Sequence, residues 1–85
     1  MYELSITMLH DRQFRLAVTF ALALWRLSPQ GLKSYECDES TRTVKMCFTD
    51  EQYVIPHDVL QNIFLRVGSD NISVRQMQSL ILSEL

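Results

Sequence analysis

The most prominent pattern in the chain is a segment near its N-terminus, residues 14–27, that is apolar around almost the whole circumference of a helix. At about 100° per residue, one narrow stripe of this helix is polar and has Ala23 among its members. The polar stripe consists of Arg12, Arg15, Thr19 and Arg26. The remaining circumference consists of Phe14, Leu16, Val18, Phe20, Leu22, Leu24, Trp25 and Leu27. We expect such a helix to be covered on one side by a small sheet of the same chain and on the other by a second copy or a different protein.

Strands are predicted on both sides of this helix. In residues 2–8 apolar and polar side chains alternate, the period-two pattern of a strand with one buried face. Asp11 stands at the expected N-cap of the helix, and Ser-Pro-Gln-Gly at 28–31 predicts its end.

A hairpin is predicted next, with arms at 32–37 and 42–49 and a polar turn at 38–41. If Cys37 pairs with Arg42, then Tyr35 faces Val44. In that register Cys37 and Cys47 lie on opposite faces of the hairpin, so we expect no disulfide between them.

The C-terminal third predicts two helices. Residues 53–55 either add a short third arm to the hairpin or lead into the next helix. Pro56 suits the first turn of that helix, and Gly68 suits its C-terminal end. Ser73 and Gln76 form a capping box, and Ile72 and Met77 occupy the positions of a hydrophobic staple. The last helix is expected from about Val74 to the C-terminus. Its predicted buried residues are Val74, Met77, Leu80, Ile81 and Leu85. Leu65 and Leu82 fall off the apolar faces and are expected to be exposed.

The order strand, helix, hairpin, helix, helix predicts an α+β fold: one domain, residues 1–85, with a small, mainly antiparallel sheet and the long first helix across one face. A chain of this length buries only about 60 to 65% of its surface on folding. Because 47% of the residues are hydrophobic and 21% are charged, we expect the apolar surplus to be used in association. The longest apolar run, residues 20–25, is too short for a membrane span, and no export signal is evident. We therefore expect a cytoplasmic protein.

The charge distribution argues against nucleic-acid binding. The net charge is −2, and residues 1–49 carry six Lys or Arg against five acids while residues 50–85 carry two against five. Neither part has the dense basic surface that nucleic acids select.

Residue types suited to catalysis or metal binding are few and widely spaced. His10, Cys37, Cys47 and His57 are separated by 27, 10 and 10 residues, so no pair has the close spacing of a zinc site, and neither cysteine is marked as a nucleophile. The only glycines, Gly31 and Gly68, cannot form a phosphate-binding loop. We predict no catalytic, cofactor-binding or metal-binding residues, and no enzyme activity.

Residues 56–85 have the outline of a helix-turn-helix, which leaves a second interpretation open. Its candidate DNA-contacting residues are Arg66, Arg75, Gln76 and Gln78. Against it, the capping box already accounts for Gln76, and residues 50–85 carry five acids against the two cations. Two helices packing to close a core is the favoured account.

Candidate protein-binding residues come mainly from the first helix. Its arginines are either the solvated edge of a buried helix or partners for acidic groups of another protein. Trp25 either belongs to the core or anchors an interface, as tryptophan often does. The candidate set is Arg12, Arg15, Leu22, Trp25, Arg26, Leu65 and Leu82.

The element order resembles that of the small DinI-like regulators of bacteria and their prophages. The resemblance rests on the opening segment 2–7, the long helix, the hairpin around 38–41 and the helix that follows, about two-thirds of the chain, without a specific motif. The chain departs from that family at residues 73–85, which contain a single acid where those proteins tend toward an acidic helix with tryptophan. The resemblance implies a small regulator that binds a protein such as a recombinase or a phage repressor, and it transfers no functional residue.

The sequence therefore suggests a small non-enzymatic regulator that self-associates as a dimer or larger oligomer and binds a protein partner. An inhibitor, anti-repressor or antitoxin that occludes or remodels its partner fits this description. The alternative is a small DNA-binding transcriptional regulator that uses residues 56–85.

Overall fold

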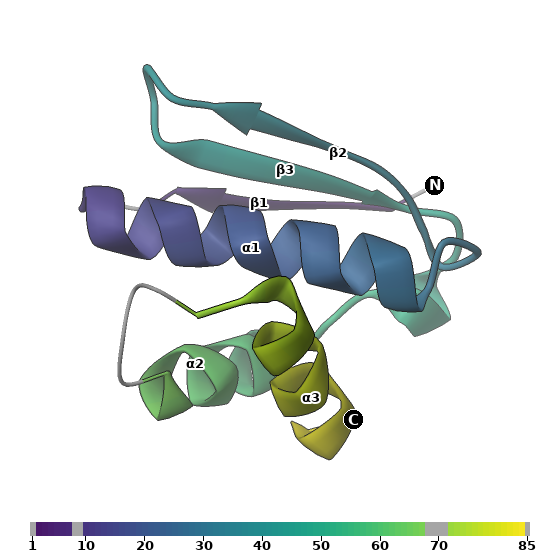
Figure 1. Ribbon diagram of the computed structural model, residues 1–85. Helices are drawn as coiled ribbons and strands as arrows, with labels where there is room; N and C mark the ends of the chain where they lie inside the picture. The colour runs from purple at the N-terminus through teal and green to yellow at the C-terminus, as the bar shows by residue number, and fades with distance from the viewer. Residues whose placement is uncertain (1, 8–9, 68–71, 85) are drawn as a thin grey trace.

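The elements of the protein stack in three layers, with one long helix in the middle (Figure 1). The computed structural model describes residues 2–7, 10–67 and 72–84. Its elements are β1 (Tyr2–Thr7), α1 (Asp11–Leu27), β2 (Leu32–Asp38), β3 (Thr43–Phe48), a 3-10 turn η1 (Glu51–Tyr53), α2 (His57–Arg66) and α3 (Val74–Glu84). The sheet forms the first layer, α1 the second, and α2 with α3 the third (Figure 1). The predicted α+β class and element order are confirmed.

The sheet has the strand order β1-β3-β2, and β3 is antiparallel to both neighbours. In the hairpin Cys37 pairs with Val44 and Tyr35 with Met46, so the predicted register is wrong by two residues. The Asp38 carboxylate accepts hydrogen bonds from the Ser40 backbone N–H (3.0 Å) and hydroxyl (2.6 Å), which moves the turn one residue along the chain. A shift of two preserves the faces of the strand, so Cys37 and Cys47 still lie on opposite faces, and both thiols are free.

Helix α1 is buried on two sides by its own chain. One side packs on β2 and β3, and the other packs on α3. Phe20 is fully buried, and its ring meets the ring of Phe64 on α2 edge to face, with centroids 5.9 Å apart. The expectation that a second copy or another protein covers the second side of this helix is therefore wrong, because α3 does so. Ala23 is fully buried and is not part of the exposed arginine stripe. The buried α1 residues are Leu16, Ala17, Phe20, Ala21, Ala23 and Leu24.

The first residues of α1 and α2 differ from the prediction by one position each. His10 occupies the N-cap of α1, so Asp11 is its first helical residue, where its carboxylate accepts a hydrogen bond from Arg42 Nε at 2.5 Å. Pro56 is the N-cap of α2 rather than a residue of its first turn. Residues 53–55 form no third arm: Tyr53 ends η1, and the chain then runs extended into α2.

The capping box at the start of α3 is confirmed. The Ser73 N–H donates to Gln76 Oε1 (3.0 Å), and the Gln76 N–H donates to Ser73 Oγ (3.1 Å). In α3, Met77 and Ile81 are fully buried, whereas Val74 and Leu80 are half-buried. Ile72 also packs against the core. The predictions for Met8, Gly68 and Leu85 lie outside the described residues. No helix in the described ranges is long and apolar enough to cross a membrane.

Candidate functional site

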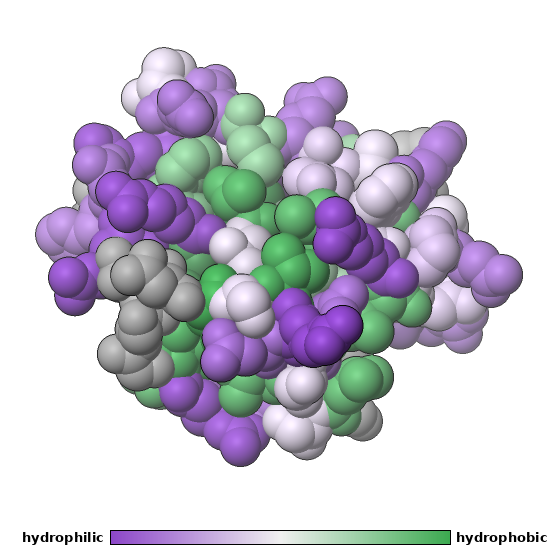
Figure 2. Space-filling view, viewed as in Figure 1, coloured by the Kyte–Doolittle hydropathy of each residue, from purple (hydrophilic) through white to green (hydrophobic). Residues whose placement is uncertain are grey.

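The outward side of α1 carries a row of apolar side chains that the rest of the described chain covers only in part. Phe14, Val18 and Leu22 are half-buried there, and Trp25 is 42% exposed. Their spacing of four, four and three residues places them on one face of the helix. We call these four residues the α1 outer stripe. Figure 2 shows hydrophobic side chains gathered over α1 and toward β2 on this face of the molecule.

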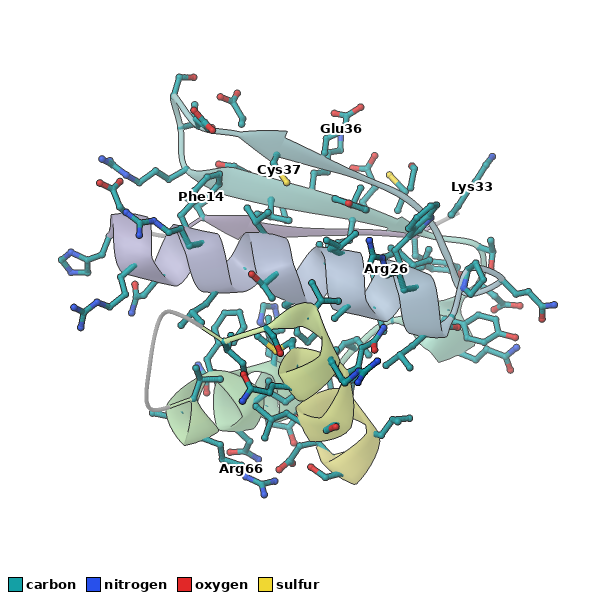
Figure 3. The ribbon with its side chains drawn as sticks, in the orientation of Figure 1. Phe14, Arg26, Lys33, Glu36, Cys37 and Arg66 are labelled. Carbon is teal, nitrogen blue, oxygen red and sulfur yellow. The ribbon has the colours of Figure 1, made fainter. Side chains whose placement is uncertain are left out.

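The outer stripe continues onto the edge strand β2. The Trp25 ring meets the ring of Tyr35 edge to face, with centroids 6.3 Å apart. Cys37, two residues further along the same face of β2, is exposed. Figure 3 shows Cys37 above α1 and Phe14 near the start of that helix. Half-exposed apolar and aromatic side chains therefore span α1 and the neighbouring strand.

Charged residues lie at both ends of the outer stripe. Arg26 lies near the end of α1 and Lys33 near the start of β2 (Figure 3), and both are exposed. At the other end a shallow depression is lined by residues of α1, of the hairpin turn and of the segment before α3. Its lining residues are Phe14, Arg15, Val18, Thr19, Glu39, Ile72 and Ser73.

Five of the predicted partner-binding residues lie on the outward part of α1. Arg12, Arg15, Trp25 and Arg26 are exposed and Leu22 is half-buried. Arg12 and Arg15 also have interaction partners within the protein. Leu65 and Leu82 are 83% and 63% exposed, as predicted, but they belong to α2 and α3 in the third layer.

Sequence reasoning missed four residues of this surface: Phe14, Val18, Tyr35 and Cys37. The spacing of Phe14 and Val18 relative to Leu22 contained the signal, but α1 is apolar almost all round. The pattern alone could not show which arc the rest of the chain would leave uncovered. Tyr35 and Cys37 join the surface only through the pairing of β2 with β3.

The residues of the alternative DNA-binding interpretation are partly engaged within the protein. The Arg66 guanidinium pairs with the carboxylate of Glu84 and donates to Ser83 Oγ at 3.3 Å. Gln76 Oε1 is held by the capping box, and Gln78 is half-buried. Arg75 is exposed. Of these four side chains, Arg75 is the one that is exposed and that takes part in no capping hydrogen bond or ion pair among the described residues.

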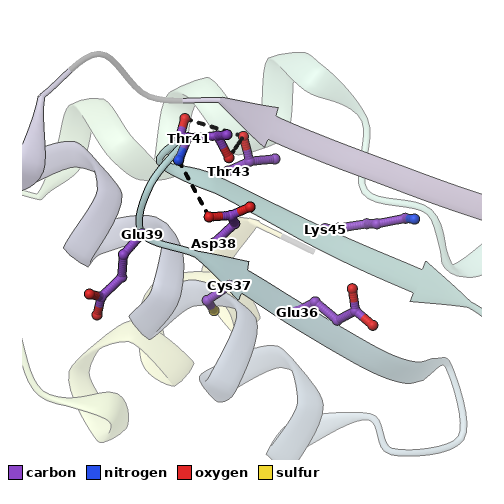
Figure 4. Close-up of a pocket in the computed structure, with 7 residues that line it drawn as sticks. All are labelled: Glu36, Cys37, Asp38, Glu39, Thr41, Thr43 and Lys45. Atoms are coloured by element: carbon purple, nitrogen blue, oxygen red, sulfur yellow. Dashed lines mark hydrogen bonds between the residues drawn. The ribbon is translucent and has the colours of Figure 1, made fainter.

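The opposite face of the sheet is polar. By the strand register it presents Glu3, Ser5, Thr7, Ser34, Glu36, Asp38, Thr43, Lys45 and Cys47. Lys45 pairs with Glu3 at 3.4 Å. A shallow hollow lies at the hairpin end of this region, where Glu36, Asp38 and Lys45 are among its lining residues (Figure 4). The hydrogen bonds from Ser40 hold the pKa of the Asp38 carboxyl below its ordinary value.

The two cysteine thiols lie on opposite faces of the sheet. Partial burial raises the pKa of the Cys37 thiol, which lowers its thiolate fraction and its nucleophilicity at neutral pH. The Cys47 thiol lies on the other face of the sheet, 4.0 Å from Glu3 Oε1. Within residues 2–7, 10–67 and 72–84, no three His, Cys, Asp or Glu side chains are placed to hold a metal ion.

Comparison of the chain with protein-family models, with curated proteins and with solved structures finds no match.

Proposed function

We propose that this protein is a small non-enzymatic regulator that self-associates and binds a protein partner, occluding or remodelling the partner's working surface. An inhibitor, an anti-repressor and an antitoxin all act in this way. The observation that carries the proposal is the α1 outer stripe with its continuation onto β2.

Helix α1 is covered incompletely by the described parts of its own chain. The chain buries two sides of α1 with its own sheet and its own α3, yet on the third side it covers a row of large apolar side chains only in part and leaves Trp25 exposed. Contiguous apolar surface on a small protein marks an interaction site more often than scattered apolar residues do. Trp25 at one end of the row is the residue type that most often dominates binding energy at protein interfaces.

The charges around the stripe favour a protein partner with acidic groups. Arg12, Arg15 and Arg26 follow the apolar row along α1. Opposite charges at the rim of an interface speed association and select the partner more than they add affinity. The element order, which resembles that of the DinI-like regulators, is consistent with the same class of function.

The test uses affinity capture followed by identification of the bound protein, with two variants that introduce the same charge. Leu22→Lys places a cation within the outer stripe, and Leu65→Lys places one on the 83% exposed position of α2. We expect the wild type to retain one defined protein, Leu22→Lys to lose it and Leu65→Lys to keep it. Light scattering after size exclusion measures self-association of the same three proteins.

Two results would contradict this function. One is a wild-type protein that stays monomeric at high concentration and retains no partner. The other is equal loss of capture in Leu22→Lys and Leu65→Lys, because the outer stripe would then have no special role.

A further inference from the structure

We propose that a second copy of this chain binds through the open edge of β2, so that two β2 strands pair antiparallel about Tyr35 and the two α1 outer stripes meet on the same side of a continuous sheet. The inference rests on the self-association in the proposed function and names the surface that performs it.

The edge of β2 offers unsatisfied backbone groups next to apolar surface. In the order β1-β3-β2, the seven-residue strand β2 has a strand partner on one side only among the residues that the structure describes. Its outward N–H and C=O groups are therefore available to pair with another strand. The contact between Trp25 and Tyr35 places the outer stripe directly beside this edge. A strand added here would cover both features at once.

A second copy fits this edge because two α1 helices would then face each other. Antiparallel pairing of identical edge strands places a two-fold axis perpendicular to the sheet, which keeps both α1 helices on one side of it. Each outer stripe then faces the other across the axis. Contact from the β2 side brings Phe14, Val18 and Trp25 together and leaves the arginine side of α1 directed away.

The register follows from strand length and charge. Tyr35 is the midpoint of β2, so pairing Tyr35 with Tyr35 places the seven residues of one strand opposite the seven of the other. In this register Glu36 lies opposite Ser34 of the second copy. Moving the pairing two residues toward the C-terminus, the smallest shift that keeps the faces aligned, sets Glu36 opposite Glu36, which is unfavourable. A shift of four sets Glu36 opposite Asp38, which repeats the repulsion.

The ends of the interface are complementary in charge. Arg26 and Lys33 lie at one end of α1 and β2, while Asp38 and Glu39 lie at the hairpin turn at the other end (Figures 3 and 4). Antiparallel pairing brings the cationic end of each copy to the acidic end of the other. The bulge between Leu32 and Ser34 limits the regular part of the new ladder to its centre, Ser34 to Glu36 of both copies.

The experiment is a charge exchange at Ser34, which is exposed on the polar face of the sheet and far from the core. Ser34→Glu would place an acid opposite Glu36 twice per dimer, and we expect the dimer dissociation constant to rise by about tenfold. Ser34→Lys should lower the constant, and adding Glu36→Lys to Ser34→Glu should restore wild-type association. Ser5→Glu on the other edge strand is the matched control and should leave association unchanged. Sedimentation equilibrium measures all five proteins.

The outcomes separate this inference from the proposed function. A dimer that responds equally to Ser34→Glu and Ser34→Lys, or to Ser5→Glu, overturns β2 pairing but leaves self-association intact. A monomer at every concentration overturns both the pairing and the self-association. A monomer whose captured partner is lost in Ser34→Glu overturns the second copy as occupant and assigns the β2 edge to the partner's own strand.

Discussion

The substitution Gly31→Ala tests how closely the turn after α1 packs on η1. Gly31 is buried, its N–H donates to the Ser28 carbonyl (3.0 Å), and its carbonyl accepts from the Thr49 N–H (2.9 Å). The backbone is thus held from both sides. An added Cβ would lie 2.8 Å from Tyr53 Cδ1, 2.9 Å from Tyr53 Cγ and 2.8 Å from Ser28 Oγ. The Ser28 hydroxyl can rotate away, but the Tyr53 ring must move to reach an ordinary contact of about 3.5 Å.

The expected free-energy change follows from two opposing effects. Overpacking at a site that cannot relax freely costs about 1 to 3 kcal/mol. Replacing glycine by alanine also removes conformational freedom from the unfolded chain, which stabilises by about 0.4 to 1 kcal/mol, and Gly31 does not have a positive φ that would oppose alanine. The steric effect is larger, so we expect Gly31→Ala to lower the free energy of unfolding by roughly 0.5 to 2 kcal/mol.

The assay is a double-mutant cycle in urea, followed by far-ultraviolet circular dichroism at low protein concentration. In a Tyr53→Ala background the obstructing ring is gone, so Gly31→Ala should become neutral or stabilising. A cost that is the same in both backgrounds would refute the reasoning, because the ring would not be its source. A stabilising Gly31→Ala in the wild-type background would refute it equally.

Three further predictions concern stability. Ile81→Ala should lower the free energy of unfolding by about 2 to 5 kcal/mol, because Ile81 is fully buried. Leu82→Ala should lower it by less than about 0.5 kcal/mol, because Leu82 is 63% exposed. Similar losses for the two variants in urea titrations would contradict the packing of α3. Ser73→Ala should cost about 1 kcal/mol through loss of the capping box, and an unchanged urea midpoint would count against it. The Arg42 guanidinium, which donates a hydrogen bond to Asp11, holds the pKa of that carboxyl below its ordinary value, so its stabilisation is present above about pH 4 and is lost as the pH falls further. Asp11→Asn should therefore reduce acid sensitivity, and an identical acid transition in the two proteins would exclude this contribution.

Much of the fold could be predicted from the sequence because the signals are local. The period-two alternation of residues 2–8 predicted β1, the apolar helical segment predicted α1, and Ser73 with Gln76 predicted the start of α3. Each of these signals depends on neighbours only a few residues apart, for which backbone geometry sets the spacing. The exposure of Leu65 and Leu82 followed in the same way.

The errors concern contacts between distant residues or fine choices of turn geometry. The hairpin register depended on the side chain of Asp38, which closes the turn at Ser40 and moves Cys37 opposite Val44. The N-cap of α1 lies at His10, and the carboxylate of Asp11, the predicted cap, instead accepts a hydrogen bond from Arg42, which is 31 residues away in the chain. Neither choice is visible in the periodicity of the adjacent strands and helix.

For the candidate surface too, some properties follow from the sequence and others depend on how distant elements pack. The sequence by itself determined that α1 is apolar around most of its circumference and that Trp25 lies near its end. Only the tertiary structure decided that α3 packs on one side of α1, that the sheet packs on another, and that the row from Phe14 to Trp25 is covered only in part. The physical reason is that the hydrophobic effect is non-directional: it requires apolar area to be removed from water without specifying which element removes it. Which apolar arc of α1 stays outside is settled by the lengths and crossing of elements that are distant in sequence.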